Sequence, residues 1–357
     1  MNIVTLNYID VCKKCTLGLD ICQEHGRLGF MIKISHGSQF AKGEMSDKNG
    51  YGYATENMLN SLERLGYHVD TNLKDADVEI WFDQPHNWKI RDGVYTIGYH
   101  PWESTELLKN QKPDWLEQMN KCDEIWTPSP LIAKWYVEYM GVRPPVYVYE
   151  HGVSPDWTPK KRTVDGTFKF LHVGGEAMRK GAKEAMQALR LGFGKNEDVS
   201  LTMKTATSSL GPGFLPRINT VGGLMPLEEL IQLFHDHHAF VYPSYGEGFG
   251  LTPLQALATG MPTITLPAWA PYGEFLNPNL EIDSKLGTSP FRKLHPGMMF
   301  HPQMESIISS MRYVRDNYEE VQNWHHAQLD LLMEKYSWDS LTAEAFEALE
   351  KRLSAKK

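Results

Sequence analysis

An alternation between short apolar runs and longer amphipathic stretches, repeated along most of the chain, constrains the fold more than any other feature. The short runs are rich in β-branched and aromatic residues, and they predict strands at residues 30–34, 78–82, 95–98, 124–127, 146–149, 168–173, 199–203, 239–242 and 262–266. The stretches between them predict helices, among them 53–65, 134–139, 182–191 and 228–236, followed by a helical tail at 304–353. Almost entirely apolar strands separated by helices form parallel sheets covered on both faces. The sequence therefore predicts an α/β fold.

A break in this alternation at residues 154–166 predicts a linker, because it contains two prolines, three consecutive basic residues and a glycine. The resulting division has five parts: an N-terminal extension at 1–28, a Rossmann-like domain at 29–153, the linker at 154–166, a second Rossmann-like domain at 167–330, and a C-terminal helix at 331–357. Two sheets joined by one linker leave a cleft between them. Ligands of open α/β sheets bind at the carboxyl ends of the strands, which predicts a site in this cleft.

Composition excludes several classes of protein. With 22% charged and 41% hydrophobic residues among 357, the chain is not largely disordered. The net charge of −8 does not point to a nucleic acid or an anionic membrane as a partner, although a local basic face remains compatible with it. No apolar run reaches the roughly 18 residues of a membrane span, and the first residues do not resemble a signal peptide. These features predict a cytoplasmic protein without a transmembrane segment.

Residues 244–262 form the most informative segment, SYGEGFGLTPLQALATGMP, which follows a predicted strand. Thr252 suits the N-cap of a helix, Pro253 suits its first position, and Gln255 completes a capping box three residues after the cap. Gly260 is placed to end the helix. The segment therefore predicts a helix that begins beside a glycine-rich turn.

The glycines at 246, 248 and 250 allow the backbone to come close to a ligand at the positive end of this helix. An anion, and most plausibly a diphosphate, is the natural guest of such a turn. Glu247 lies in the same turn, where a carboxylate can accept hydrogen bonds from sugar hydroxyls.

This segment resembles the donor-binding motif of retaining GT-B glycosyltransferases, specifically of glycosyltransferase family 4. The matching positions are Pro243, Ser244, Glu247, Gly248, Phe249, Gly250, Ala256, Gly260 and Pro262. In that family the first acid of the motif, here Glu247, contacts the donor sugar, and the second acid holds the ribose hydroxyls of the nucleotide. Gln255 stands in the second position and can hydrogen-bond a ribose without charge assistance.

Other landmarks of the family follow in order. Residues 168–181 resemble the strand, loop and helix start that present basic groups to the diphosphate, with Lys180 at the lysine position. The family has an arginine five residues earlier, where this chain has Gly175, so either Arg179 replaces it or one charge is missing. Residues 48–53 resemble the first glycine-rich loop, which faces the diphosphate from the opposite domain. The resemblance thus implies the following donor-binding set: Gly50, Tyr51, Gly52, Arg179, Gly248, Phe249, Gly250, Leu251, Thr252 and Gln255.

The resemblance also implies residues on the first domain. His100 follows a predicted strand, where the family commonly places a histidine close to the donor sugar. Trp102 and Glu103 come next and are candidates for acceptor binding, and Glu103 is alternatively a partner for His100. Residues 336–338 resemble the opening of the family's last helix, which packs back on the first domain. The expected architecture is therefore GT-B, with an acceptor-side domain and a donor-binding domain facing each other across a cleft.

The activity implied is metal-independent transfer, with retention at the anomeric carbon, from a UDP- or GDP-sugar to a hydroxyl of a glycan or other acceptor, with no cofactor required. The catalytic residues implied are His100, Glu247 and Lys180. Alternatives are a transferase acting on a modified nucleic-acid base or protein side chain, an epimerase or phosphorylase of the same fold, and a sugar-nucleotide binder without catalysis.

The N-terminal extension holds a second candidate site. Cys12, Cys15, Cys22 and His25 lie within fourteen residues and could hold a tetrahedral zinc ion. The other interpretation is that these are buried or free thiols on an extra helix and strand.

Overall fold

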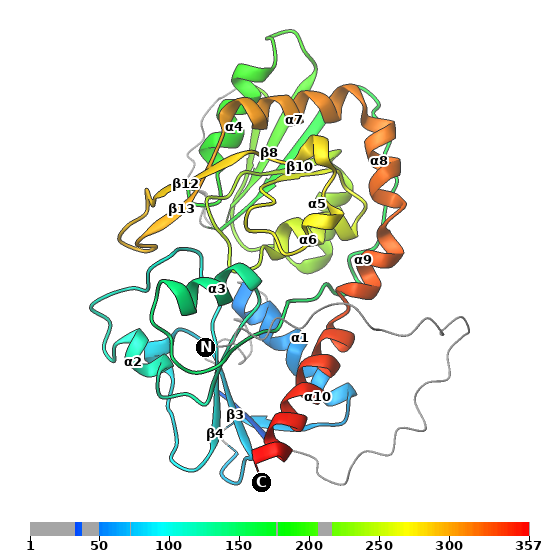
Figure 1. Ribbon diagram of the computed structural model, residues 1–357. Coiled ribbons are helices and arrows are strands. Elements are labelled where there is room, and N and C mark those ends of the chain that lie inside the picture. The colour runs from blue at the N-terminus through cyan, green and yellow to red at the C-terminus, as the bar shows by residue number, and fades with distance from the viewer. Residues whose placement is uncertain (1–32, 38–49, 72, 176–177, 206–215, 357) are drawn as a thin grey trace.

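The computed structural model describes residues 33–37, 50–71, 73–175, 178–205 and 216–356, and these form two parallel sheets, each with its own helices (Figure 1). The first sheet has six strands in the order β2-β1-β3-β4-β5-β6. Their bounds are β1 Lys33–His36, β2 His68–Thr71, β3 Val78–Phe82, β4 Tyr95–Tyr99, β5 Glu124–Thr127 and β6 Val146–Val148. The two central strands, β3 and β4, are almost wholly buried, as expected for a sheet covered on both faces.

Helices cover the first sheet. They are α1 Gly50–Arg64, the 3-10 turn η3 Pro85–Asn87, α2 Trp115–Met119 and α3 Pro130–Glu138. Helix α3 begins as its sequence requires, because Ser129 accepts a hydrogen bond from the Ile132 amide and Pro130 occupies the first position. Helix α1 packs against the last helix of the chain, α10 Trp338–Lys356.

The second sheet has five strands in the order β11-β10-β7-β8-β9. Its strands are β7 Phe168–Val173, β8 Val199–Lys204, β9 Ile218–Val221, β10 Ala239–Tyr242 and β11 Thr263–Thr265. The helices of this half are α4 Ala182–Gly192, α5 Leu227–His235, α6 Leu251–Ala258, α7 Met304–Asp316, α8 Tyr318–His326 and α9 Leu329–Lys335, with short 3-10 turns η4 Gly273–Phe275 and η5 Pro278–Leu280. The α/β fold and its two-domain GT-B arrangement are thereby confirmed.

An antiparallel hairpin, β12 Ser284–Thr288 and β13 Met298–Pro302, extends from the second half toward the first (Figure 1). The Thr105 amide donates to the carbonyl of Met298 at 3.2 Å, and the Met298 amide donates to Oγ1 of Thr105 at 2.8 Å. The ring of Phe300 stacks on Trp135 of α3 with centroids 5.8 Å apart. The hairpin therefore joins the two halves. Its sequence did not predict it, because β12 is mostly polar and partly exposed.

The C-terminal helix returns to the first sheet, as the resemblance implied. Arg352 of α10 donates to both carboxylate oxygens of the buried Glu124, at 2.7 and 2.9 Å. The hydroxyls of Tyr149 and Thr342 lie 2.6 Å apart. The chain thus crosses between the halves twice. Among the described residues, no helix is long and apolar enough to span a bilayer.

The segment at 154–166 forms no helix or strand, but it is not a free tether. The guanidinium of Arg162 is buried and donates to the carbonyls of Thr259 and Phe234. Its backbone also exchanges two hydrogen bonds with the side chain of Gln322. The segment therefore packs firmly on the second half.

Candidate active site

The glycine-rich turn connects β10 to α6 as predicted, but the helix starts earlier than the capping prediction. Its N-cap is Gly250 at φ 88°, a left-handed conformation that favours glycine, and the side chain of Thr252 makes no capping bond. Pro253 is the third helical residue rather than the first. The capping-box prediction was wrong because the backbone at Gly250 already turns into the helix.

The end of α6 is as predicted. Gly260 adopts φ 70°, its amide donates to the carbonyl of Leu257, and the Met261 amide donates to that of Ala256. This is the usual pair of bonds by which a glycine ends a helix.

Four consecutive amides at the start of α6 have no hydrogen-bond acceptor in the part of the chain that the structure describes: those of Gly248, Phe249, Gly250 and Leu251. They lie at the positive end of the helix. The turn is buried, and a Cβ on Gly248 would lie 2.5 Å from Cβ of Pro101 on the first half. Unbonded donors at a buried interface therefore face the loop that follows β4.

A second helix N-terminus meets this turn from the first half. Helix α1 begins at Gly50, and a Cβ there would lie 3.7 Å from Cδ1 of Leu251. The Tyr51 hydroxyl donates to the Pro101 carbonyl at 3.4 Å, and Gly52 is buried in the first turn. The positive ends of two helices thus approach each other across the interface, which favours an anion between them.

Gln255 also lies at this interface. It is buried on α6, and its side chain interacts with the Tyr53 hydroxyl of α1. That hydroxyl accepts a hydrogen bond from the Ser154 amide at 3.3 Å. The predicted ribose-binding residue therefore points toward the opposite domain.

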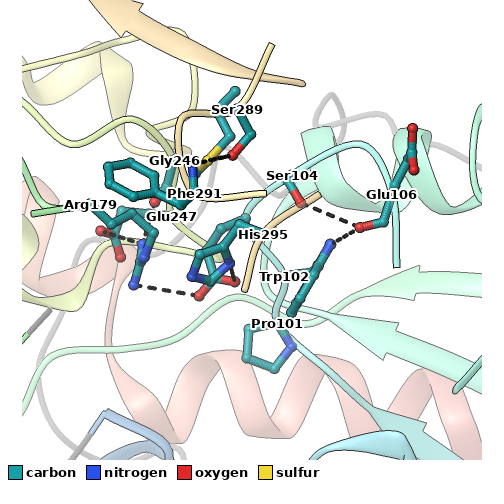
Figure 2. A network of polar contacts seen from close by, with 12 residues as sticks. Pro101, Trp102, Ser104, Glu106, Arg179, Gly246, Glu247, Ser289, Phe291 and His295 are labelled. Atoms are coloured by element: carbon teal, nitrogen blue, oxygen red, sulfur yellow. Dashed lines mark hydrogen bonds and ion pairs between the residues drawn. The ribbon is translucent and has the colours of Figure 1, made fainter. Parts of the chain in front are cut away.

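The carboxylate of Glu247 is 7% exposed and is surrounded by donors. Its Oε1 accepts from the Ser244 hydroxyl at 2.8 Å and from the Tyr242 hydroxyl at 3.0 Å. Nη1 of Arg179 donates to the same oxygen at 3.0 Å (Figure 2). Nζ of Lys180 lies 3.7 Å from Oε2. Burial would raise the pKa of Glu247, but Lys180, Arg179 and the two hydroxyls outweigh it and hold the pKa below its ordinary value. Glu247 is therefore ionised at neutral pH.

The loop between β7 and α4 positions both cations. The Tyr245 amide donates to the Arg179 carbonyl at 3.0 Å, which joins this loop to the glycine-rich turn. Nη1 of Arg179 also donates to the carbonyl of Gly246 at 2.5 Å. Arg179, Lys180 and Glu247 therefore lie together, as the sequence predicted.

Glu103 adds a second carboxylate from the first half. Its Oε1 lies 3.7 Å from Nη2 of Arg179, and its Oε2 lies 3.4 Å from Nδ1 of His295, which lies between β12 and β13 (Figure 2). Its partners are therefore Arg179 and His295, and the alternative pairing with His100 was wrong. Sequence reasoning missed His295 because no motif surrounds it and its contact depends on the unpredicted hairpin.

His100 lies inside an aromatic cluster rather than on an open wall. The Tyr136 hydroxyl donates to the His100 carbonyl at 2.9 Å, so its oxygen accepts from Nδ1–H of His100 at 2.7 Å. Trp102 stacks on the imidazole and Trp115 meets it edge-on. Burial lowers the pKa of His100 to about 3, so the ring is neutral. In this conformation it has no exposed surface for a sugar, and its predicted role stays a prediction.

Trp102 is likewise buried, and its Nε1 donates to the Glu106 carbonyl at 2.9 Å (Figure 2). The candidate zinc ligands Cys12, Cys15, Cys22 and His25 lie outside the described residues. Within the described ranges, no three His, Cys, Asp or Glu side chains are grouped so that they could hold a metal ion.

Comparisons with known proteins agree with this geometry. Residues 167–278 match the family model described as "Glycosyl transferases group 1". No curated protein sequence gives a significant match. Among solved structures, sucrose-phosphate synthase from Thermosynechococcus elongatus is similar at a TM-score of 0.68 and 12% identity, covering 91% of this chain and 100% of that one.

Two further structures have the same fold. The HepE protein of Anabaena, in complex with UDP and glucose, has a TM-score of 0.61 at 11% identity and covers 89% of this chain and 99% of its own. WaaG, described as a glycosyltransferase involved in lipopolysaccharide biosynthesis, has a TM-score of 0.56 at 12% identity and covers 83% and 95%. Residues 167–278 are thus a group 1 glycosyltransferase domain, and the chain is a glycosyltransferase of the GT-B fold.

Proposed function

We propose that this enzyme transfers a sugar, with retention, from a UDP- or GDP-sugar to a hydroxyl of a glycan or other acceptor. The observation that carries the proposal is the meeting of the two helix N-termini at Gly50 and Leu251, beside Arg179 and Lys180. Together with the unbonded amides at 248–251, they provide donors and positive charge for a diphosphate. Support also comes from two similar structures with UDP and a sugar, HepE and the pneumococcal O-GlcNAc transferase GtfA.

In the proposed step the acceptor oxygen forms a bond to the anomeric carbon while the bond from that carbon to the diphosphate oxygen breaks. The electron pair leaves with the diphosphate, and the acceptor proton passes to the departing phosphate oxygen. Lys180, Arg179 and the amides stabilise the negative charge that develops on the leaving group. Glu247 accepts hydrogen bonds from the sugar hydroxyls. The step uses no metal ion.

The balance of charge around Arg179 and Lys180 indicates that Glu103 has a different role from Glu247. In the described conformation Glu247 and Glu103 together neutralise Arg179 and Lys180. A diphosphate would add further negative charge beside these two carboxylates, so one carboxylate has to move away from the cations when the donor binds. Glu103 belongs to the opposite domain, and separation of the domains would both uncover the buried turn and remove Glu103 from Arg179.

We expect Glu103→Gln to lower the donor KM about fivefold with kcat little changed, because an amide no longer competes with the diphosphate for Arg179. Steady-state kinetics with varied donor measures this. Glu106→Gln is the matched control, since Glu106 is on the same loop but pairs with Lys109. A raised acceptor KM with an unchanged donor KM would contradict this competition and place Glu103 at the acceptor.

The donor and the stereochemistry are tested together. The purified chain is incubated with a panel of UDP- and GDP-sugars, and released nucleotide is measured by chromatography. We expect turnover with one nucleotide class, slow without an acceptor, and an α-linked product from an α-linked donor by NMR. A β-linked product would contradict retention. Failure of every nucleotide to bind in calorimetry would overturn the proposed donor site.

A further inference from the structure

His172 is a buried histidine beside the cluster of Lys180 and Glu247, and the mechanism above gives it no role. It lies one residue before the end of β7, and none of its surface is exposed. Burial lowers the pKa of His172 to about 4, so its imidazole is neutral at neutral pH. Its Nδ1 lies 2.9 Å from the Val241 carbonyl of β10. Because a carbonyl can only accept, Nδ1 carries the ring proton and Nε2 has a lone pair.

This Nε2 has no hydrogen-bond partner among the described residues. The Val241 bond fixes the ring, so Nε2 cannot exchange places with Nδ1 without losing that bond. A buried acceptor without a donor destabilises a fold, and such atoms in native proteins call for an explanation such as a functional role. The atom that completes Nε2 has to be a hydrogen-bond donor.

The side chain of Lys180 passes beside this lone pair. A Cβ on Gly174 would lie 2.8 Å from Cδ of Lys180 and 3.4 Å from Nε2 of His172, so both border the space that this glycine leaves free. The ring of His172 also stacks on Tyr242 with centroids 5.6 Å apart, and Nζ of Lys180 lies 5.5 Å from the centre of the same Tyr242 ring. The Tyr242 hydroxyl in turn donates to Glu247. His172 is therefore the neutral, buried member of this cluster.

A neutral acceptor affects an ammonium differently from a carboxylate. In the described conformation Nζ of Lys180 lies 3.7 Å from Oε2 of Glu247, which neutralises its charge. In the proposed reaction the ammonium has to face the diphosphate, and Glu247 has to face the sugar hydroxyls. An imidazole lone pair accepts one of the three ammonium protons and adds no negative charge, so two protons and the full positive charge remain for the phosphate oxygens.

We propose that His172 is a positioning residue for Lys180, and that its Nε2 accepts a hydrogen bond from Nζ when the ammonium turns from Glu247 to the donor diphosphate. The bond fixes the direction of the ammonium at the moment when the leaving group gains charge. This role rests on the proposed function, because it requires a diphosphate beside Lys180.

Two replacements separate the two ring nitrogens. His172→Asn keeps a donor near the position of Nδ1 and loses Nε2, whereas His172→Gln places an amide oxygen near the position of Nε2 and loses the Nδ1 donor. We expect His172→Asn to lower kcat about tenfold, the usual effect of losing a hydrogen bond to a charged group, with the donor KM changed less than about twofold. His172→Gln should keep more of kcat than His172→Asn. The opposite order would show that the ring only ties β7 to Val241, and would overturn the proposal.

A double-mutant cycle tests whether His172 acts through Lys180. In the Lys180→Ala background, His172→Asn should lower kcat by less than about twofold more. A full tenfold loss in that background would contradict the proposal, and a raised donor KM with it would place Nε2 on the donor itself. His237→Asn is the matched control, because His237 is buried before the opposite end of β10, where its ring contacts Leu233 and Thr202. This control should keep the kcat of the wild type, and an equal loss there would overturn the proposal.

Nitrogen NMR of the full chain with isotopically labelled histidine observes Nε2 directly. We expect the His172 Nε2 signal to move to the hydrogen-bonded range when UDP or GDP is added to the wild type, and to stay unbonded in Lys180→Ala. An unmoved signal in wild-type protein saturated with nucleotide would overturn the role of His172 alone. Failure of both nucleotides to bind in calorimetry would instead overturn the proposed donor site, and this role with it.

Discussion

Lys180→Ala is expected to lower kcat about 10²- to 10³-fold, the usual loss when one preorganised group that stabilises developing charge is removed. Nζ of Lys180 lies 3.7 Å from Oε2 of Glu247 and 5.5 Å from the ring centre of Tyr242, which directs the ammonium into the cluster beside the start of α6. The donor KM should change less than kcat, because the charge on the diphosphate grows as the bond to the sugar breaks. Initial rates with the preferred donor measure both constants.

Lys183→Ala is the matched control, because Lys183 is exposed on α4 three residues further along the chain. It should leave both constants near those of the wild type. Arg179 remains beside Glu247 in the Lys180 variant, so the fold should be retained, and circular dichroism checks this. A folded Lys180→Ala variant with wild-type kcat would remove this residue from the mechanism.

The folded protein is expected to lose stability steeply as the pH falls from about 6.5 to 5, where imidazoles rather than most carboxylates take up protons. Burial lowers the pKa of His36 and His172 to about 4 and that of His100, His151 and His325 to about 3. Unfolding returns these imidazoles to the ordinary value of 6.5, so the unfolded chain binds protons that the folded chain does not. Their contribution to stability is therefore present above pH 6.5 and is lost as the pH falls toward the folded pKa values.

One carboxyl has the opposite effect on the number of protons taken up on unfolding. Burial raises the pKa of Glu150 to about 7, so at pH 5.5 the folded chain keeps a proton that the unfolded chain releases. The five imidazoles less this carboxyl give a net uptake on unfolding of about four protons, which corresponds to about 5 kcal/mol per pH unit. His238, whose pKa burial lowers to about 4, adds to this uptake. That is a large part of the total stability of a typical domain.

Urea unfolding between pH 7.5 and 5 measures this slope, with the m-value checked for constancy. His151→Leu should reduce the uptake by about one proton, because both ring nitrogens of His151 are buried without a hydrogen-bond partner among the described residues. His68→Gln is the control, since solvent reaches the His68 ring in the folded and the unfolded chain. A free energy of unfolding that is level across this range would contradict the expectation.

Much of the fold could be predicted because buried parallel strands have a local signature. The strands at 78–82, 124–127, 168–173 and 239–242 begin and end where their apolar runs do. The edge strand β9 lacks this signature and was missed, because it reads Ile-Asn-Thr-Val with two exposed positions. The grouping of Lys180 with Glu247 was also predictable, since both follow neighbouring strands of one sheet.

Contacts between the halves could not be read from local patterns. Thr105 and Met298 are 193 residues apart and meet only because the hairpin reaches across the interface. The burial of His100 could not be predicted either, although the rings that enclose it lie in its own half. A histidine after a strand has the same local sequence whether aromatic rings enclose it or a cleft exposes it. The start of α6 was misplaced because Thr252 and Pro253 suit a cap, while the left-handed turn at Gly250 depends on the surrounding fold.

The two chain crossings between the halves run side by side, and this limits how the halves can move. Val153 forms a parallel bridge with Ser337, and the Val153 amide donates to the Tyr336 carbonyl at 2.8 Å. Because both covalent connections between the halves pass through one place, a rotation of one half against the other has its pivot there. Sliding one half along the other would break the hydrogen bond from the Val153 amide to the Tyr336 carbonyl. Displacement grows with distance from the pivot. An opening of the interface between the halves would therefore be a hinge motion, and the halves would separate most at the points farthest from Val153 and Ser337.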